Sequence, residues 1–356
     1  MSGTSLDGLD IVACTFEYDQ SKWEFEVLGS RMTEFPKLLE GKLRQSTRLM
    51  GQELILLDVE YGNWLGQETK KFMMDYSLKP DLISSHGYTV FHQPNNGLTL
   101  QIGSGHAIYT ACKTPVVFDF RSLDVALGGQ GAPLVPIGDQ LLFAQYDVCL
   151  NLGGIANLSA EVRGKRIAYD VVATNMVLNH LSNKVGHAYD RDGAMARNGK
   201  VSEQLLQLLE NIDYFKMAYP KSLGYEYVSD HILPVIEDNK VSLIDQLATY
   251  AEHIAMRIAH DISQIHQQQE QKSVICLITG GGAHNGYLIE RLKHHLADHV
   301  KLEVPDTTLI DFKEAIIFAF LGLLRMQNEI NCLCSVTGAS HDSSSGITTG
   351  HMNLEI

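Results

Sequence analysis

The chain has little positive charge and no basic stripe. It holds 28 Lys and Arg against 42 Asp and Glu, which gives a formal net charge of −14. Nucleic acids and anionic membranes are bound by clusters of cations, so the charge argues against both as partners. An anionic nucleotide remains compatible with this composition, because loops and a divalent cation can hold its phosphates.

Long apolar runs and paired cysteines are also missing. No apolar stretch approaches the roughly 18 residues of a membrane-spanning helix, and we find no signal peptide. We therefore expect neither secretion nor membrane insertion, and we expect a cytoplasmic protein. The six cysteines are scattered, and Cys332 and Cys334 lack the spacing and the second pair of a zinc site. They predict reduced core residues.

Two common nucleotide motifs are absent, but the first ten residues form a different candidate. No Lys ends a Walker-type loop, and the glycines do not have Rossmann spacing. Residues 1–10 combine two glycines, three hydroxyl side chains and two carboxylates before the strand-like run 11–16. Such a turn lets backbone N–H groups approach a phosphate while a carboxylate holds a metal ion. Alone, it is equally typical of an ordinary Gly/Ser turn.

Two further glycine-rich loops follow strand-like runs. One is Asn151–Ser159, after Val148–Leu150, and the other is Ile278–Asn285, with three consecutive glycines. Glycine lets a backbone pass close to a flat ligand, which a Cβ would block. With phosphate-type loops in both halves, the chain resembles the two-lobed ATPases that include actin, sugar kinases and heat-shock chaperones.

The length of 356 residues suggests about two domains. Prolines near 133–137 predict the boundary between the two domains. The N-terminal lobe would comprise residues 1–138 and the C-terminal lobe residues 139–356. The last segment, 331–356, is expected to pack back on the first lobe. Periodicity predicts helices over 54–71 and 242–264, and strands at 82–85, 115–120, 148–151 and 274–278. We therefore predict an α/β fold with mixed sheets flanked by helices and an interlobe cleft.

Polar clusters between the loops are candidates for a second substrate. Residues 85–94 follow a strand, where binding residues gather in α/β sheets. Residues 119–124 and 128–133 add two acids, an Arg and an amide, a mixture that suits sugar hydroxyls and a carboxylate. His86 and His92 are equally typical of hydrogen-bonded structural histidines, and Arg121 could instead pair with Asp124 at the surface.

Seven motifs carry a more specific resemblance. They are Ser2–Gly8, His86–His92, Asp119–Arg121, Ala126–Pro136, Asn151–Asn157, Tyr189–Gly193 and Ser335–Ser340. In this order, across nearly the whole chain, they resemble the anhydro-N-acetylmuramic acid kinase family. The resemblance implies a two-lobed sugar-kinase fold, a homodimer and a role in cell-wall recycling. It also implies that ATP and Mg²⁺ are used to open a 1,6-anhydro sugar with water and to phosphorylate O6.

The resemblance also implies site residues. Nucleotide contacts are expected from Gly3, Thr4, Ser5, Asp7, Gly8, Asp10, Asn151, Gly153, Gly154, Asn157, Gly280, Gly281, Gly282 and Asn285. Sugar contacts are expected from His86, Thr89, His92, Arg121, Asp124, Gly129, Gln130, Asn175 and Glu314. Asp7 is the candidate for Mg²⁺, through phosphate or water. Asp10 is expected mainly to orient its strand, and Glu314, placed in a first helical turn, is equally typical of a helix-dipole charge.

Opening the sugar bridge needs a general base for the attacking water, while O6 attacks the γ-phosphate in line. Asp170 matches the acid of the family's Asp-Thr-Gly-Pro-Gly-Asn turn and is the predicted base; a purely structural role is the alternative. Residues 171–174 are Val-Val-Ala-Thr, and valine does not readily take the positive φ of glycine. We therefore expect a different backbone path there.

Other departures leave alternatives open. Asn179 stands where the family has a second Asp, Tyr88 where it has Gln, and Tyr225 where it has Arg, which removes a cation. A divergent kinase for a related sugar is one alternative, and a chaperone-like or actin-like nucleotide-binding module is another. A phosphate loop of this type normally joins two strands, so we also expect a strand before Met1.

Overall fold

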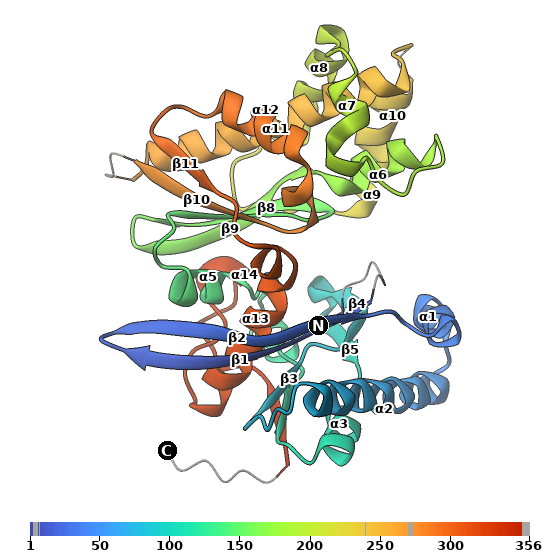
Figure 1. Cartoon of the computed structure of the whole chain (residues 1–356), viewed down its shortest axis with the longest axis vertical. Coiled ribbons are helices and arrows are strands. Elements are labelled where there is room, and N and C mark those ends of the chain that lie inside the picture. Colours follow the sequence, from blue (N-terminus) through green and yellow to red (C-terminus); the bar gives the residue numbers. More distant parts are fainter. Residues whose placement is uncertain (3–5, 7, 239, 270–272, 351–356) are drawn as a thin grey trace. The chain divides into compact units, whose positions relative to one another are not determined.

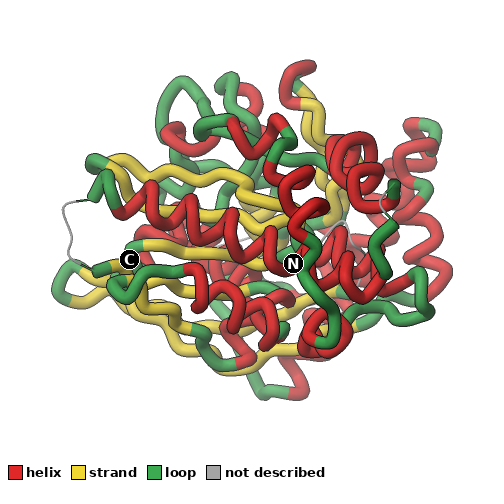
Figure 2. Tube along the Cα trace, turned by 90° about the horizontal axis from the view of Figure 1, so that it is seen from above, coloured by secondary structure: helices red, strands yellow, loops and turns green. Residues whose placement is uncertain are grey.

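The chain forms two compact units, and the computed structural model describes residues 1–2, 6, 8–238, 240–269 and 273–350 (Figure 1). Unit 1 comprises Met1–Leu142 and Phe312–Ile356, and unit 2 comprises Phe143–Asp311. The division thus follows residue 142 rather than the predicted 138. The C-terminal segment that belongs to unit 1 begins at residue 312, whereas the segment expected to pack on the first lobe began at residue 331. Helices and strands are mixed throughout the described chain (Figure 2).

Unit 1 contains small sheets. Its strands are β1 (Leu9–Asp19), β2 (Lys22–Thr33), β3 (Ile83–Ser85), β4 (Tyr88–Gln93), β5 (Leu98–Ile102), β6 (Val116–Phe118) and β12 (Ile347–Thr349). The pairs β1–β2 and β4–β5 are antiparallel hairpins. Strand β6 pairs in parallel with β3 and antiparallel with β12, so a late segment of the chain completes an early sheet.

The helices of unit 1 are α1 (Lys37–Arg44), α2 (Gly51–Asp75), α3 (Gly105–Cys112), α4 (Ser122–Ala126), α5 (Pro136–Leu142), most of α13 (Thr307–Met326) and α14 (Cys334–Thr337). Leu57, Tyr61 and Leu65 recur every four residues along α2 and are buried in one core with Ile108 of α3. The predicted helix over 54–71 is confirmed as part of α2.

A cavity of 410 Å³ lies between β1 and β3 in unit 1, and its lining includes Phe72 and Phe318. Met1 and Asp10 both line this cavity, and Met1 N donates to Asp10 O at 2.7 Å while Asp10 N donates to Met1 O at 2.8 Å. This mutual exchange is the pattern of an antiparallel pair. The expected strand before Met1 stays a prediction.

Unit 2 is built on one mixed sheet in the order β11–β10–β7–β8–β9. Its strands are β7 (Val148–Leu152), β8 (Ile155–Val162), β9 (Lys165–Ala173), β10 (Val274–Thr279) and β11 (Val300–Glu303). Strands β7 to β9 form an antiparallel meander, whereas β10 and β11 are parallel to β7. The predicted strands 148–151 and 274–278 and the mixed α/β class are confirmed.

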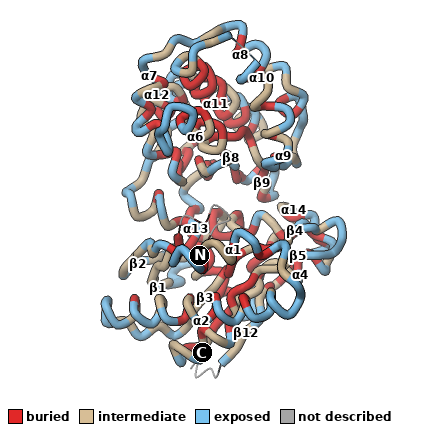
Figure 3. The backbone as a smooth tube through the Cα atoms, turned by 90° about the vertical axis from the view of Figure 1, so that its right-hand side faces the viewer, coloured by how far each residue is buried: buried red, intermediate tan, exposed pale blue. Residues whose placement is uncertain are grey.

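The helices of unit 2 are α6 (Asn175–Asn183), α7 (Ala194–Arg197), α8 (Glu203–Glu210), α9 (Tyr225–Tyr227), α10 (Leu233–Glu237), α11 (Leu243–His266) and α12 (Gly286–His295). Ser242 Oγ accepts from Asp245 N and caps α11, and Ile254, Ile258 and Ile262 are fully buried. Figure 3 shows α11 largely in the colour of buried residues. The predicted helix over 242–264 is confirmed.

Single turns complete the described secondary structure. They are the 3₁₀ turns Ser46–Arg48, Pro94–Asn96, Arg191–Gly193, Asp213–Lys216 and Gly281–His284, and the π turn Val228–Ile232. Within the ranges 8–238, 240–269 and 273–350, no helix combines the length and apolar character needed to cross a membrane.

A buried ion pair joins α5 to α13 and generates a stability prediction. Lys313 Nζ lies 2.6 Å from Asp139 Oδ1, with side chains 7% and 3% exposed. Asp139→Ala leaves the ammonium of Lys313 buried without its carboxylate partner. We therefore expect the free energy of unfolding, measured in urea, to fall by about 3–5 kcal/mol. Glu60→Ala, which breaks the exposed pair Lys42–Glu60, is the control and should cost less than about 1 kcal/mol. Equal effects of the two variants would contradict the prediction.

Candidate functional site

The first glycine loop is mostly outside the described residues. Gly3, Thr4, Ser5 and Asp7 fall there, so their expected contacts with nucleotide and Mg²⁺ stay predictions. Gly8 lies against β2, because a Cβ would stand 2.7 Å from Met32 Sδ. Asp10 is the second residue of β1, and its expected roles in orienting that strand and contacting the nucleotide stay predictions.

Arg121 and the buried His86 form a partly buried hydrogen-bonded pair in unit 1. Arg121 Nε donates to His86 Nε2 at 2.9 Å, and Arg121 Nη1 donates to Gly131 O at 2.7 Å. His86 Nδ1 therefore carries the proton and donates to Gly87 O at 2.9 Å. Burial, followed by the charge of Arg121, lowers the pKa of His86. His86 is thus a neutral imidazole held in one orientation.

Asp124 lies in the interior and holds the loop that carries two sugar-site candidates. Its Oδ2 accepts from Gly131 N and its Oδ1 from Thr337 Oγ1, both at 2.7 Å. A Cβ on Gly129 would stand 2.2 Å from Asp124 Oδ2, so only glycine fits there. Gln130 N donates to Thr337 O at 2.8 Å. Asp124 therefore joins the 128–131 loop to α14 in the interior, and the expectation of a surface pair with Arg121 is wrong.

Thr89 and His92, two other sugar-site candidates, lie on β4 and contact polar side chains of β5. His92 Nδ1 lies 3.1 Å from Thr99 Oγ1. Gln101 Nε2 donates to Thr99 Oγ1 at 2.9 Å and to Thr89 Oγ1 at 3.3 Å. The hairpin thus presents a connected row of polar side chains, of which Thr99 and Gln101 were not predicted.

Glu314 does not lie where the sequence predicted. Helix α13 begins at Thr307, so Glu314 is well inside the helix rather than in its first turn. The reason is Asp306, whose Oδ1 accepts from Leu309 N at 3.0 Å and starts the helix earlier. The helix-dipole explanation for Glu314 is therefore wrong. Its carboxylate has electrostatic interactions with Arg121 and Asp10.

The second and third glycine loops pack against each other in unit 2. Gly280 has φ +81°, and a Cβ there would stand 2.3 Å from Asn151 Oδ1. A Cβ on Gly282 would stand 2.7 Å from Leu152 Cβ. Glycine is thus required where the turn after β10 approaches the end of β7.

Asn175, predicted to contact the sugar, lies with these nucleotide-loop candidates. Its Nδ2 donates to Leu152 O at 3.2 Å, and Thr174 Oγ1 donates to Gly153 O at 2.6 Å. Thr174 N also donates to Gly154 O at 2.8 Å. The β7–β8 turn is therefore fixed on the start of α6.

A row of polar residues crosses the sheet from the second loop to the predicted base. Asn157 pairs with Asn151 of β7 on one side and with Asp170 of β9 on the other. Residues directly opposite in antiparallel strands point to the same face. Asn157 is exposed, and Asn151 and Asp170 are half-buried. The three candidates thus share one accessible face.

Asp170 lies in a strand and not in a turn. Strand β9 continues to Ala173, and none of residues 170–175 has positive φ. This is the expected consequence of Val171 and Val172, which favour extended backbone. The acid therefore projects from the edge strand of the sheet.

The carboxylate of Asp170 is held on one oxygen. Oδ2 accepts from Leu223 N at 2.9 Å and from Ser222 Oγ at 3.1 Å. Partial burial raises the pKa of Asp170, and these two hydrogen bonds oppose part of the shift. A carboxylate with a raised pKa is a better proton acceptor than an ordinary aspartate.

The motif 189–193 supports the third glycine loop, a role that the sequence did not reveal. Asn285 Oδ1 caps α12 by accepting from Leu288 N at 3.0 Å, and Asp192 Oδ1 accepts from Gly286 N at 2.8 Å. Gly193 has φ +66°, and a Cβ there would stand 2.4 Å from Asn285 Oδ1. The Asp-Gly pair was the available signal, because it marks a tight turn.

Comparison with known proteins identifies the family. The sequence profile of "Anhydro-N-acetylmuramic acid kinase" matches residues 1–350. A protein of that name from Aliivibrio fischeri is 34% identical over 364 residues, covering 98% of this chain and 97% of that protein. Another from Vibrio parahaemolyticus is 37% identical and covers 98% and 96%. The chain belongs to the anhydro-N-acetylmuramic acid kinase family. It is a sugar kinase, and kinases of this kind use ATP.

Among solved structures, a ROK family glucokinase from Streptomyces griseus matches with a TM-score of 0.34 and 11% identity, over 82% of this chain and 93% of that chain. A likeness at this level carries no argument about the site. Family membership therefore rests on the sequence comparisons.

Gly193 tests whether the motif 189–193 supports ATP binding. Gly193→Ala places a Cβ against Asn285, so we expect a raised KM for ATP in steady-state kinetics and a stability loss of more than about 1 kcal/mol. Gly186 is the matched control: its φ is +82° but no atom lies within 4 Å of an added Cβ. Gly186→Ala should lose stability without changing the KM for ATP. Equal KM values in the two variants would contradict the prediction.

Proposed function

We propose that this chain uses ATP to open 1,6-anhydro-N-acetylmuramic acid with water and to phosphorylate O6. The products are N-acetylmuramic acid 6-phosphate and ADP, in peptidoglycan recycling. One observation carries the proposal. The chain matches the family over residues 1–350, and Asp170 stands at the position of the family's acidic residue. The raised pKa of Asp170 suits a general base.

Asp170 accepts a proton from water on Oδ1, because Oδ2 already accepts two hydrogen bonds from the chain. The water oxygen forms a bond to the anomeric carbon, and the bond from that carbon to O6 breaks. O6 then attacks the γ-phosphorus in line, and the bond to ADP breaks. Water supplies the new anomeric hydroxyl, and ATP supplies the phosphoryl group.

We expect the glycine loops of unit 2 to contact the nucleotide. Gly280 and Gly282 let the turn after β10 pack directly on Asn151 and Leu152, where a Cβ would collide, whereas an added Cβ on Gly281 would have only Asn175 Nδ2 within 4 Å, at 3.8 Å. Gly281 is therefore the glycine of this turn that is open to a ligand. Among the residues that the structure describes, no group of three or more His, Cys, Asp or Glu could hold a metal ion alone. Mg²⁺ usually takes one or two carboxylates together with substrate phosphates, so Asp7, which lies outside the described residues, stays the candidate to hold a phosphate-bound Mg²⁺. Mg²⁺ would neutralise charge on the phosphates during transfer.

The sugar-side candidates of unit 1 suit a substrate that carries hydroxyls and a carboxylate. Arg121 supplies a fixed cation, and the neutral His86 keeps it in place. Tyr88, a departure from the family pattern, is 8% exposed in β4, so it packs in the core. The alternative of a related sugar loses support on this point. The homodimer and the cytoplasmic location stay predictions.

Replacement of the base tests the assignment. Asp170→Asn keeps the shape of the side chain but removes its capacity to take a proton, so we expect kcat for ADP release with the anhydro sugar to fall about 100-fold to 10,000-fold. Asp213→Asn is the control, because the Asp213 side chain is 91% exposed. Wild-type-like turnover by Asp170→Asn would exclude Asp170 as the base.

The pH dependence follows from the same carboxylate. A general base acts when deprotonated, so kcat/KM should fall as the pH drops through the pKa of Asp170. Because burial raises that pKa, we expect the acidic limb at a pH above the ordinary range of aspartate. A pH–rate profile of the wild-type protein measures it. A limb at the ordinary aspartate value would contradict the assignment.

A further inference from the structure

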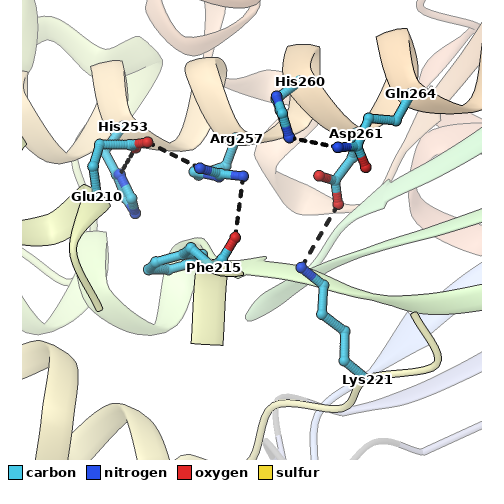
Figure 4. A network of polar contacts seen from close by, with 8 residues as sticks. All are labelled: Glu210, Phe215, Lys221, His253, Arg257, His260, Asp261 and Gln264. Carbon is cyan, nitrogen blue, oxygen red and sulfur yellow. Dashed lines mark hydrogen bonds and ion pairs between the residues drawn. The ribbon is translucent and has the colours of Figure 1, made fainter. Parts of the chain in front are cut away.

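A buried ion pair lies beside the strand that carries the candidate base. Lys221 Nζ is 3.9 Å from Asp261 Oδ2, and the two side chains are 4% and 6% exposed. Figure 4 shows Lys221 pointing toward Asp261 of α11, and Lys221 O accepts a hydrogen bond from the backbone of Asp170 in the edge strand β9. Neither residue belongs to the site described above.

The surroundings of the pair are buried and aromatic. Lys221 Nζ lies 5.0 Å from the ring centre of Tyr214 and 5.8 Å from that of Tyr169. Arg257, His260 and Tyr169 are the other titratable groups that act on Asp261. Burial lowers the pKa of Lys221 and raises that of Asp261. Burying two charges costs desolvation free energy that their attraction does not always repay. A buried ion pair therefore suggests a role other than stabilising the fold.

Lys221 is connected to Asp170 through consecutive backbone and side-chain contacts. Asp170 N donates to Lys221 O at 3.2 Å, and the next two residues, Ser222 and Leu223, both donate to Asp170 Oδ2. Tyr169 and Asp170 point to opposite faces of β9 because side chains alternate along a strand. The Lys221–Asp261 pair lies on the face of β9 to which Tyr169 points, opposite the face of Asp170. It can therefore act on the Asp170 carboxylate only through residues 221–223.

The same helix holds the segment at a second place. Glu210 accepts from Arg257 Nη1 at 2.9 Å and lies 2.7 Å from His253 Nδ1. Arg257 Nη2 donates to Phe215 O at 3.4 Å. Figure 4 shows these contacts on the same helix as Asp261. The segment 210–223 is therefore fixed on α11 near both of its ends.

We propose that the Lys221–Asp261 pair positions the catalytic base. By fixing residues 221–223 on α11, it holds Oδ2 of Asp170 and leaves Oδ1 to accept the proton of water. Lys221 and Asp261 are thus positioning residues, which act through Asp170 and touch no substrate. This inference rests on the proposed role of Asp170.

A double-mutant cycle tests the coupling. Lys221→Met keeps the alkyl stem, and Asp261 can then take a proton because its pKa is already raised. We expect kcat to fall roughly 100-fold, since a small misplacement of a catalytic group has an effect of that size, with an unchanged KM for ATP. In an Asp170→Asn background the same change should have no further effect. An equal loss in both backgrounds would overturn the proposal.

A second readout needs no turnover. In Lys221→Met, the amide of Leu223 should exchange its hydrogen faster, because the segment that donates to Asp170 is no longer fixed. Glu252→Gln is the matched control, because Glu252 lies on the same helix but bonds Arg291 and His295; it should leave Leu223 exchange and kcat unchanged. Unchanged Leu223 exchange in Lys221→Met would refute the positioning role. An inactive wild-type protein would refute only the proposed function.

Discussion

The antiparallel register of β7, β8 and β9 is the constraint on which the candidate site of unit 2 depends. It aligns Asn151, Asn157 and Asp170 across three strands on one face. A slip of one residue would turn all of these side chains toward the core. The core side chains of β7, including Leu150 and Leu152, are fully buried and oppose such a slip. The turn at Gly153–Gly154, fixed by Thr174, adds a local restraint.

Hydrogen-bond partners distinguish the acids of this chain. Asp124 accepts hydrogen bonds on both oxygens from within its own unit and has no exposed surface, so it serves the loop at Gly129. Asp261 is buried against Lys221. Asp170 is half-buried and accepts on one oxygen, which leaves the other for chemistry. In a chain with a net charge of −14, composition could not separate these roles.

Local patterns predicted the elements, whereas tertiary contacts determined the site. Periodicity gave α2 and α11, and apolar runs gave β7 and β10, because these signals lie within one segment. The start of α13 was missed because Asp306 caps it earlier than expected. The burial of Asp261 could have been predicted from the sequence. Asp261 follows Leu247 and Ile254 at seven-residue intervals, on the apolar face of the helix, where an apolar residue is expected. The pairing of Arg121 with His86 had none, because the partners are distant in sequence.

The central claim is that one turnover adds both water and a phosphoryl group to the sugar. Mass spectrometry of the product formed from 1,6-anhydro-N-acetylmuramic acid, ATP and Mg²⁺ tests it most directly. We expect the sugar to gain the mass of one phosphoryl group plus one water, with one ADP formed for each sugar. A sugar phosphorylated without added water, or ADP formed without any change in the sugar, would contradict it.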